Sequence, residues 1–76
     1  MIRLLALDLD GTLLTGDKSL PPRVVQSVQD VARAGVRVVL VTGRRYPSAR
    51  RYADRLAGLA ALAVHNGALV FEATER

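Results

Sequence analysis

The sequence predicts an α/β fold, a three-layer Rossmann-like parallel sheet, of which the chain holds three strands and two helices. Two observations predict it. Short apolar runs alternate along the chain with segments whose apolar residues recur every three or four positions. Proline and glycine mark the changes from one kind of segment to the other. Strands joined by helices in this way lie parallel, through right-handed crossovers.

The first two elements are a strand and a helix. The strand is expected at Ile2–Leu9, an almost continuous apolar run, and a loop at Asp10–Leu20 follows it. The helix begins at Pro21–Pro22, because proline suits a first helical turn, and it ends at Gly35. Its apolar residues have helical spacing: Val24, Val25, Val28, Val31 and Ala32.

The remaining elements repeat this order. Val36–Val41 predicts a second strand, apolar enough to be covered on both faces of the sheet. A second helix begins at Pro47 or Ser48 and ends near Gly58. Leu59–Val64 is the third apolar run and predicts the third strand. Together these elements form half of a doubly wound fold.

Composition limits where such a chain works. The 76 residues form at most one small domain, and the absence of cysteine excludes disulfides and thiolate metal sites. No apolar stretch reaches the roughly 20 residues of a membrane span. Acidic residues interrupt the apolar N-terminal segment, which therefore does not resemble a secretory signal. We expect a cytoplasmic protein with no membrane partner.

The net charge of +4 is concentrated in one segment. Five of the eleven basic residues lie in RRYPSARRYADR: Arg44, Arg45, Arg50, Arg51 and Arg55. As a helix, this segment has one apolar face and one charged face. The charged face has two interpretations, a solvated helix face and a nucleic-acid patch. The solvated face is favoured, because no further aromatic or basic residues extend the basic segment.

The motif LDLDGTLLTGDKS, at Leu7–Ser19, admits several kinds of site. It differs from a phosphate-binding P-loop because Asp17 separates Gly16 from Lys18, and because prolines, rather than helix amides, follow it. A calcium loop beginning at Asp8 would need glycine at its sixth position and glutamate at its twelfth, and both are missing. Neither a P-loop nor a calcium loop is predicted.

The acidic pair Asp8 and Asp10 remains. It lies at the carboxyl end of the first strand, where open α/β sheets bind their ligands. Residues two apart on a strand share a face, so both carboxylates can approach one bound group. An Asp-Gly turn at a strand end is the alternative. Against this alternative, Asp8 belongs to a strand expected to be buried, where an unpaired acid is costly.

Three motifs together carry a family resemblance. DLDGT after the first strand, VVLVTGR at the second and HNGA after the third resemble the haloacid dehalogenase (HAD) superfamily of aspartate-dependent phosphatases, over nearly the whole chain. The extended motif LDLDGTLLTGDKSL is similar to the Cof-type subgroup of sugar and small-metabolite phosphatases. The resemblance implies a HAD-like core and a small phosphorylated metabolite as substrate.

The resemblance also implies catalytic roles. Asp8 would be the nucleophile that forms an aspartyl-phosphate, and Asp10 the general acid and base. The implied cofactor is Mg²⁺, held by the Asp8 carboxylate and the Asp10 backbone carbonyl. Its charge would offset the repulsion between nucleophile and phosphate.

Phosphate binding is implied for further residues. Thr42 would donate a hydrogen bond to a phosphoryl oxygen, and the amides of Leu9–Gly11 and Gly43 would do the same. Arg44 would reach a substrate phosphate or cap the following segment, and both alternatives stay open. Asn66 would lie near the site, although Asn-Gly is also a strong hairpin signal.

The departure from the family lies in missing motifs. The superfamily has a later lysine and further acidic residues, whereas Lys18 is the only lysine here and lies in the first loop. We expect residues 1–76 to be the N-terminal part of a HAD-like core, with the cap and the C-terminal half of the core absent. Such a chain would be weak or inactive alone, with a sheet edge free for self-association.

Two other functions stay open at this point. A phosphotransferase or phosphomutase would use the same pair, Asp8 and Asp10. A non-enzymatic module would use the basic segment on an anionic partner, with salt-sensitive binding.

Overall fold

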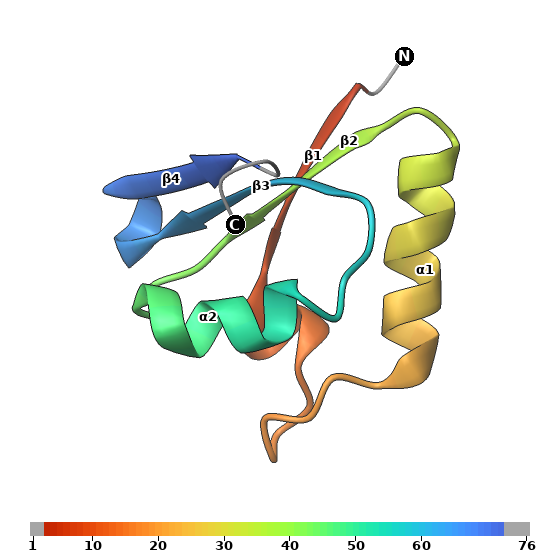
Figure 1. The fold of residues 1–76 in the computed structure, drawn as a ribbon. Coiled ribbons are helices and arrows are strands. Elements are labelled where there is room, and N and C mark those ends of the chain that lie inside the picture. The colour runs from red at the N-terminus through yellow and green to blue at the C-terminus, as the bar shows by residue number, and fades with distance from the viewer. Residues whose placement is uncertain (1–2, 73–76) are drawn as a thin grey trace.

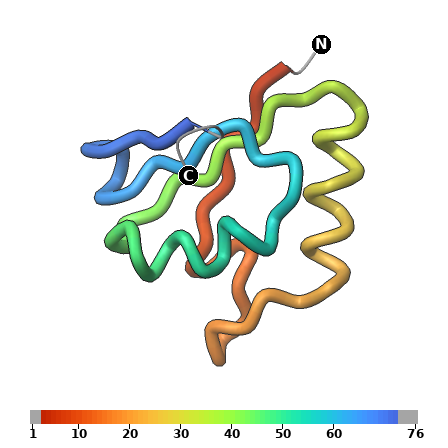
Figure 2. Tube along the Cα trace, in the orientation of Figure 1, coloured from red at the N-terminus to blue at the C-terminus, as the bar shows by residue number. Residues whose placement is uncertain are grey.

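A computed structural model describes residues 3–72 of the chain. These residues form four strands and two helices (Figure 1), and Figure 2 follows the chain through the long loop between the first strand and the first helix. The elements in chain order are β1 (Leu4–Asp8), the turn η1 (Leu9–Leu13), α1 (Pro22–Arg33), β2 (Arg37–Val41), α2 (Tyr46–Ala53), β3 (Leu59–Val64), the turn η2 (His65–Gly67) and β4 (Leu69–Glu72). The α/β class is confirmed.

The four strands form one sheet in the order β1-β2-β3-β4. β1 pairs with β2 and β2 with β3 in parallel, as predicted for strands joined by helical crossovers. The prediction of only three strands is wrong, because β4 pairs antiparallel with β3. The sheet is therefore mixed, with β4 at one edge.

The fourth strand exists because the chain reverses at η2. His65, Asn66 and Gly67 all have positive φ angles, of 51°, 54° and 94°, and this left-handed backbone turns β4 back along β3. The turn matches the hairpin signal of Asn-Gly. Phe71 of β4 pairs with Leu62, and its ring lies 4.2 Å from that of Tyr46 on α2. This aromatic contact holds β4 against the rest of the fold.

One helical layer accompanies the sheet within residues 3–72. Two right-handed crossovers between successive neighbouring strands place α1 and α2 on the same face. The side chains of β2 that point to this face, Val38 and Leu40, are fully buried, whereas Val39 and Val41 between them are half-buried. Coverage of β2 on both faces was therefore the wrong expectation for these residues.

The helix boundaries follow local chemistry. Pro21 precedes α1 and Pro22 is its first residue, and Gly35, with φ of 94°, follows its end. α2 begins at Tyr46, one residue earlier than predicted, and it ends at Ala53, before the predicted end near Gly58. In the part of the chain that the structure describes, neither helix has the length and apolar character needed to cross a membrane.

Burial predicts which leucines stabilise the fold. We expect Leu40→Ala to lower the free energy of unfolding by about 3 kcal/mol, because Leu40 is 0% exposed and its removal leaves a cavity. Leu4→Ala is the matched control, since Leu4 is 61% exposed, and we expect a change below about 0.5 kcal/mol. Urea unfolding followed by circular dichroism measures both. Equal losses would contradict the assigned core.

Candidate active site

The candidate site lies where β1 and β2 end. Asp8, the last residue of β1, is the register partner of Val41, the last residue of β2. The residues that follow each strand, Leu9 and Thr42, therefore leave the sheet side by side. This carboxyl edge is the place where open α/β sheets bind ligands.

The chain leaves β1 in a tight turn that carries Asp10. Asp10 (φ −71°, ψ 127°) and Gly11 (φ 81°, ψ −6°) have the backbone angles of a type II turn, which needs a positive φ at its third residue. Glycine adopts that angle without strain. The Leu14 amide donates to the Leu9 carbonyl at 2.9 Å and closes the wider turn η1, while the buried side chains of Leu9 and Leu13 anchor it.

Asp8 is exposed at the end of its strand. Its Oδ1 accepts a hydrogen bond from the Leu9 amide at 2.8 Å, which orients the carboxylate. The expectation that Asp8 would be buried is wrong, because no helix of residues 3–72 covers that face of β1. Its ionised form is therefore solvated, and the cost of burying an acid is no argument for its role.

Asp10 is held by two cations. Its Oδ2 accepts from Arg44 Nε at 2.9 Å, while its Oδ1 accepts from Arg44 Nη2 at 2.9 Å and from Lys18 Nζ at 3.0 Å. The paired contact with Arg44 is the bidentate geometry that gives the strongest carboxylate interactions. Hydrogen bonds from Arg44, and next from Lys18, hold the pKa of the Asp10 carboxyl well below its ordinary value. Asp10 is therefore an anion in this arrangement.

Arg44 is itself braced by α2. Its Nη1 donates to Ser48 Oγ at 2.7 Å, and its Cζ lies 5.0 Å from the centre of the Tyr52 ring, a cation–π contact. The Tyr52 hydroxyl donates to the Lys18 carbonyl at 2.8 Å. Asp10 contributes to raising the pKa of Arg44 above its ordinary value. α2 thus supports both cations that face Asp10.

Thr42 connects the second and third motifs. It is buried, and its Oγ1 accepts from the Arg44 amide at 3.1 Å, which leaves the hydroxyl proton free to donate. The Thr42 carbonyl accepts from the Asn66 amide at 2.9 Å. A Cβ atom at Gly43 would lie 3.3 Å from Asn66 Oδ1, so the Asn66 side chain lies directly against Gly43. The residues after β2 and β3 therefore meet at the site.

The predicted site residues lie at one edge of the sheet, and three residues that the sequence did not suggest lie with them. Lys18, Ser48 and Tyr52 join the network around Asp10 and Arg44. Lys18 was set aside because of its place in the first loop, yet its positive φ of 65° turns that loop back to the site. The sequence signal that could have indicated Lys18 is that it is the only lysine and lies eight residues after Asp10.

A magnesium ion would find hard oxygen ligands here. The Asp8 carboxylate is exposed and the Asp10 carbonyl follows on the same turn, and both suit an ion that keeps several waters and binds through few protein oxygens. Residues 3–72 contain no group of three or more histidine, cysteine, aspartate or glutamate side chains that could hold a metal ion. The residues present therefore fit Mg²⁺ shared with a phosphate, not a metal enclosed by protein.

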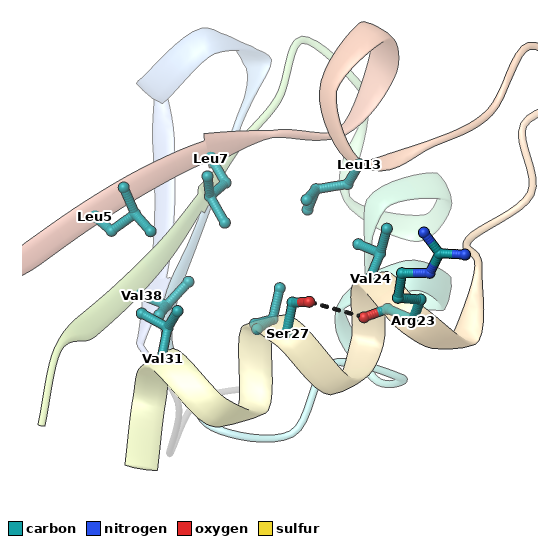
Figure 3. Close-up of a pocket in the computed structure, with 9 residues that line it drawn as sticks. Leu5, Leu7, Leu13, Arg23, Val24, Ser27, Val31 and Val38 are labelled. Carbon is teal, nitrogen blue, oxygen red and sulfur yellow. Dashed lines mark hydrogen bonds between the residues drawn. The ribbon is translucent and has the colours of Figure 1, made fainter. Parts of the chain in front are cut away.

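The apolar pocket of the molecule is a separate feature. It measures about 290 Å³ and lies between β1 and α1. Figure 3 shows Leu5 and Leu7 of β1 facing Val24 and Val31 of α1 across it. No acid lines this pocket, and its Ser27 hydroxyl donates to the Arg23 carbonyl within the same helix. The candidate catalytic residues lie at the carboxyl edge of the sheet instead.

Comparisons with known proteins show the family of the chain. The family model of haloacid dehalogenase-like hydrolases matches residues 5–76. A pyridoxal phosphate phosphatase of Escherichia coli is 40% identical over 55 residues, which cover 72% of this chain and 20% of that protein. A 5-amino-6-(5-phospho-D-ribitylamino)uracil phosphatase of Bacillus subtilis is 37% identical over 67 residues, 88% of this chain and 25% of that protein.

Solved structures share the fold. A haloacid dehalogenase-like hydrolase of Bacteroides thetaiotaomicron superimposes with a TM-score of 0.91 at 25% identity, over 100% of this chain and 30% of that one. A second phosphatase of the superfamily from that organism gives a TM-score of 0.83 at 28% identity, over 99% of this chain and 28% of that one. The chain thus spans about a fifth to a third of the length of these relatives.

The held carboxylate predicts how stability depends on pH. Because the pKa of Asp10 is lower in the folded chain than its ordinary value of 3.8, its ionised form stabilises the fold above that value. This contribution is lost progressively as the pH falls below 3.8 toward the lower pKa of the folded chain. We expect Asp10→Asn to unfold with a shallower pH dependence in that range, retaining the slope from Asp17, whose pKa is also lowered. Urea unfolding between pH 7 and 2.5 measures the stability of both proteins. Parallel dependence of stability on pH in the wild type and in Asp10→Asn would contradict the ion pairs of Asp10 with Arg44 and Lys18.

Proposed function

Because the chain belongs to the haloacid dehalogenase-like hydrolase family, we propose that it is part of a phosphatase that hydrolyses phosphate monoesters through Asp8. One observation carries the proposal. An exposed, oriented carboxylate at the end of β1 lies beside a turn that holds a second carboxylate, with the buried Thr42 hydroxyl at the end of the neighbouring strand. The proposed nucleophile, the proposed proton carrier and a hydrogen-bond donor for the phosphate thus lie at one edge of the sheet.

In the proposed reaction, an Asp8 oxygen attacks phosphorus, forming the aspartyl-phosphate bond as the bond to the substrate's leaving oxygen breaks. As the substrate binds, Asp10 takes up a proton from solvent, and the leaving oxygen then takes that proton from Asp10. Water then attacks phosphorus and gives its proton to Asp10, and the bond between phosphorus and the Asp8 oxygen breaks. Splitting one hydrolysis into two displacements lowers each barrier.

The contacts of Asp10 favour its role as base. Held by Arg44 and Lys18, Asp10 is ionised and ready to accept the proton of water. Donation to the leaving oxygen needs those two cations drawn away from it. An incoming phosphate competes for them, because guanidinium and ammonium groups bind phosphate as they bind carboxylate. Arg44 and Lys18 would therefore turn from the Asp10 carboxylate to the phosphate when the substrate binds.

Phosphate binding is proposed for the residues around this pair. The Thr42 hydroxyl, the amides of Leu9–Gly11 and Gly43, and the cation Arg44 donate toward the phosphoryl oxygens, and Asn66 closes the site. Mg²⁺, held by the Asp8 carboxylate and the Asp10 carbonyl, would supply positive charge between nucleophile and phosphate. The shared oxygen ligands on one turn support that assignment.

The scope of the proposal follows the relatives. We place residues 1–76 as the N-terminal part of a HAD-like core of the Cof type, in the cytoplasm, acting on a small phosphorylated metabolite. Residues 3–72 hold one lysine and no cluster of three acids, so we propose weak activity for the 76-residue chain alone. β1 pairs only with β2 among these residues, which leaves an edge for self-association.

The reaction is tested by magnesium-dependent hydrolysis of phenyl phosphate at high protein concentration. We expect Asp8→Asn to reduce turnover to the buffer background, because the amide cannot act as the nucleophile. Removal of magnesium by a chelator should do the same. Asp54→Asn is the matched control, since it makes the same chemical change at an exposed residue of the α2 C-terminus and should keep the activity.

Turnover that survives Asp8→Asn would overturn the proposed nucleophile. Adding a sugar alcohol as a competing acceptor tests the alternative of a phosphotransferase, which would use the same aspartates. Phosphate on the acceptor, instead of free phosphate, would show transfer in place of hydrolysis.

A further inference from the structure

The five arginines of the basic segment divide into two groups. Three have partners within the described chain. Arg44 binds Asp10, Arg50 Nε donates to Asp54 Oδ2 at 3.3 Å, and Arg55 Nη2 donates to the Leu20 carbonyl at 3.2 Å. These three are accounted for by packing and by the candidate active site.

Arg45 and Arg51 form the second group. Both are exposed, and within residues 3–72 their guanidinium groups have no hydrogen-bond or ion-pair partner. Together with Pro47 and Ser48 they line an open groove of about 560 Å³ along α2. No acid lines this groove. Two unpaired positive charges that face one hollow create a local potential that attracts anions.

The groove adjoins the candidate active site through Ser48. Ser48 lines the groove, and its Oγ accepts from Arg44 Nη1 at 2.7 Å. The other two nitrogens of that guanidinium bind Asp10. A single guanidinium group therefore separates the groove from the carboxylate that serves the leaving oxygen in the proposed reaction.

The geometry points to a second anion-binding subsite at Arg45, Ser48 and Arg51, which takes a carboxylate or second phosphate on the alcohol part of the substrate. The inference rests on the proposed function, in which Asp10 serves the leaving oxygen, so that the alcohol part of the substrate lies on the side of Asp10 and of the groove. The substrate class is then a phosphate monoester that carries a further anionic group. Guanidinium groups suit this task, since they bind both carboxylate and phosphate through paired hydrogen bonds.

Two probes that differ only in the second anion test the subsite. Phenyl phosphate and 4-carboxyphenyl phosphate are titrated into the chain with magnesium, and the dissociation constants are measured by NMR chemical shifts. We expect the wild type to bind the carboxylated probe about fivefold more tightly, as two partly solvated ion pairs allow. The preference should shrink as salt is raised.

The double variant Arg45→Ala/Arg51→Ala should bind both probes equally, with its affinity for phenyl phosphate within twofold of the wild type. Arg33→Ala/Arg37→Ala is the charge-matched control. Arg37 begins β2 and Arg33 ends α1, at the opposite end of the sheet, so this variant should keep the preference. All four side chains are exposed, and circular dichroism verifies that both variants fold.

Several results would overturn the subsite. In the wild type, equal affinities for the two probes, or binding of neither, would do so. A preference for the carboxylated probe that survives Arg45→Ala/Arg51→Ala, or that is lost equally in Arg33→Ala/Arg37→Ala, would do so as well. Tighter binding of a single-stranded oligonucleotide, lost in the same variant, would assign the groove to nucleic acid instead. Selective probe binding without Asp8-dependent hydrolysis would reject the proposed reaction and keep the subsite, so the two failures are distinguishable.

Discussion

The bidentate ion pair between Asp10 and Arg44 is the interaction on which the candidate site depends. It joins residues 34 positions apart, one on the turn after β1 and the other on the loop after β2. The type II turn at Gly11 presents the carboxylate, and Ser48 and Tyr52 of α2 position the guanidinium. Besides this pair, the Tyr52 hydroxyl, which donates to the Lys18 carbonyl, links the first loop to α2.

The pair also sets the charge balance of the site. Asp8 and Asp10 carry two negative charges, and Lys18 and Arg44 carry two positive ones. Asp8 has neither cation on its carboxylate, which leaves it free for the proposed metal ion and phosphate, whereas Asp10 is held in its ionised form. Two neighbouring carboxylates thus receive different environments, which is how one site assigns a nucleophile and a proton carrier. The groove beside Ser48 extends the positive potential away from this pair.

Local sequence patterns predicted the features that depend on neighbouring residues, which are the positions of the strands and helices. Apolar periodicity located β1, β2, β3 and both helices, and parallel strands brought Asp8, Thr42 and Asn66 to one edge. The exposure of Asp8 and of one face of β2 was missed, because strand coverage depends on packing and not on the apolar run itself. β4 was missed because Leu69–Glu72 is too short for a strand pattern, and only the turn before it signalled a hairpin. The approach of Lys18 depends on one residue with left-handed backbone, which composition does not encode.

A double-mutant cycle between Asp10→Asn and Arg44→Gln, measured by urea unfolding at pH 7 and low salt, tests directly whether this pair holds the two loops together. The exposed i,i+4 pair Arg50 and Asp54, treated in the same way, gives the reference. We predict that the double variant at Asp10 and Arg44 loses clearly less stability than the sum of its single variants, with a coupling larger than the reference pair. Additive losses at Asp10 and Arg44 would contradict the account.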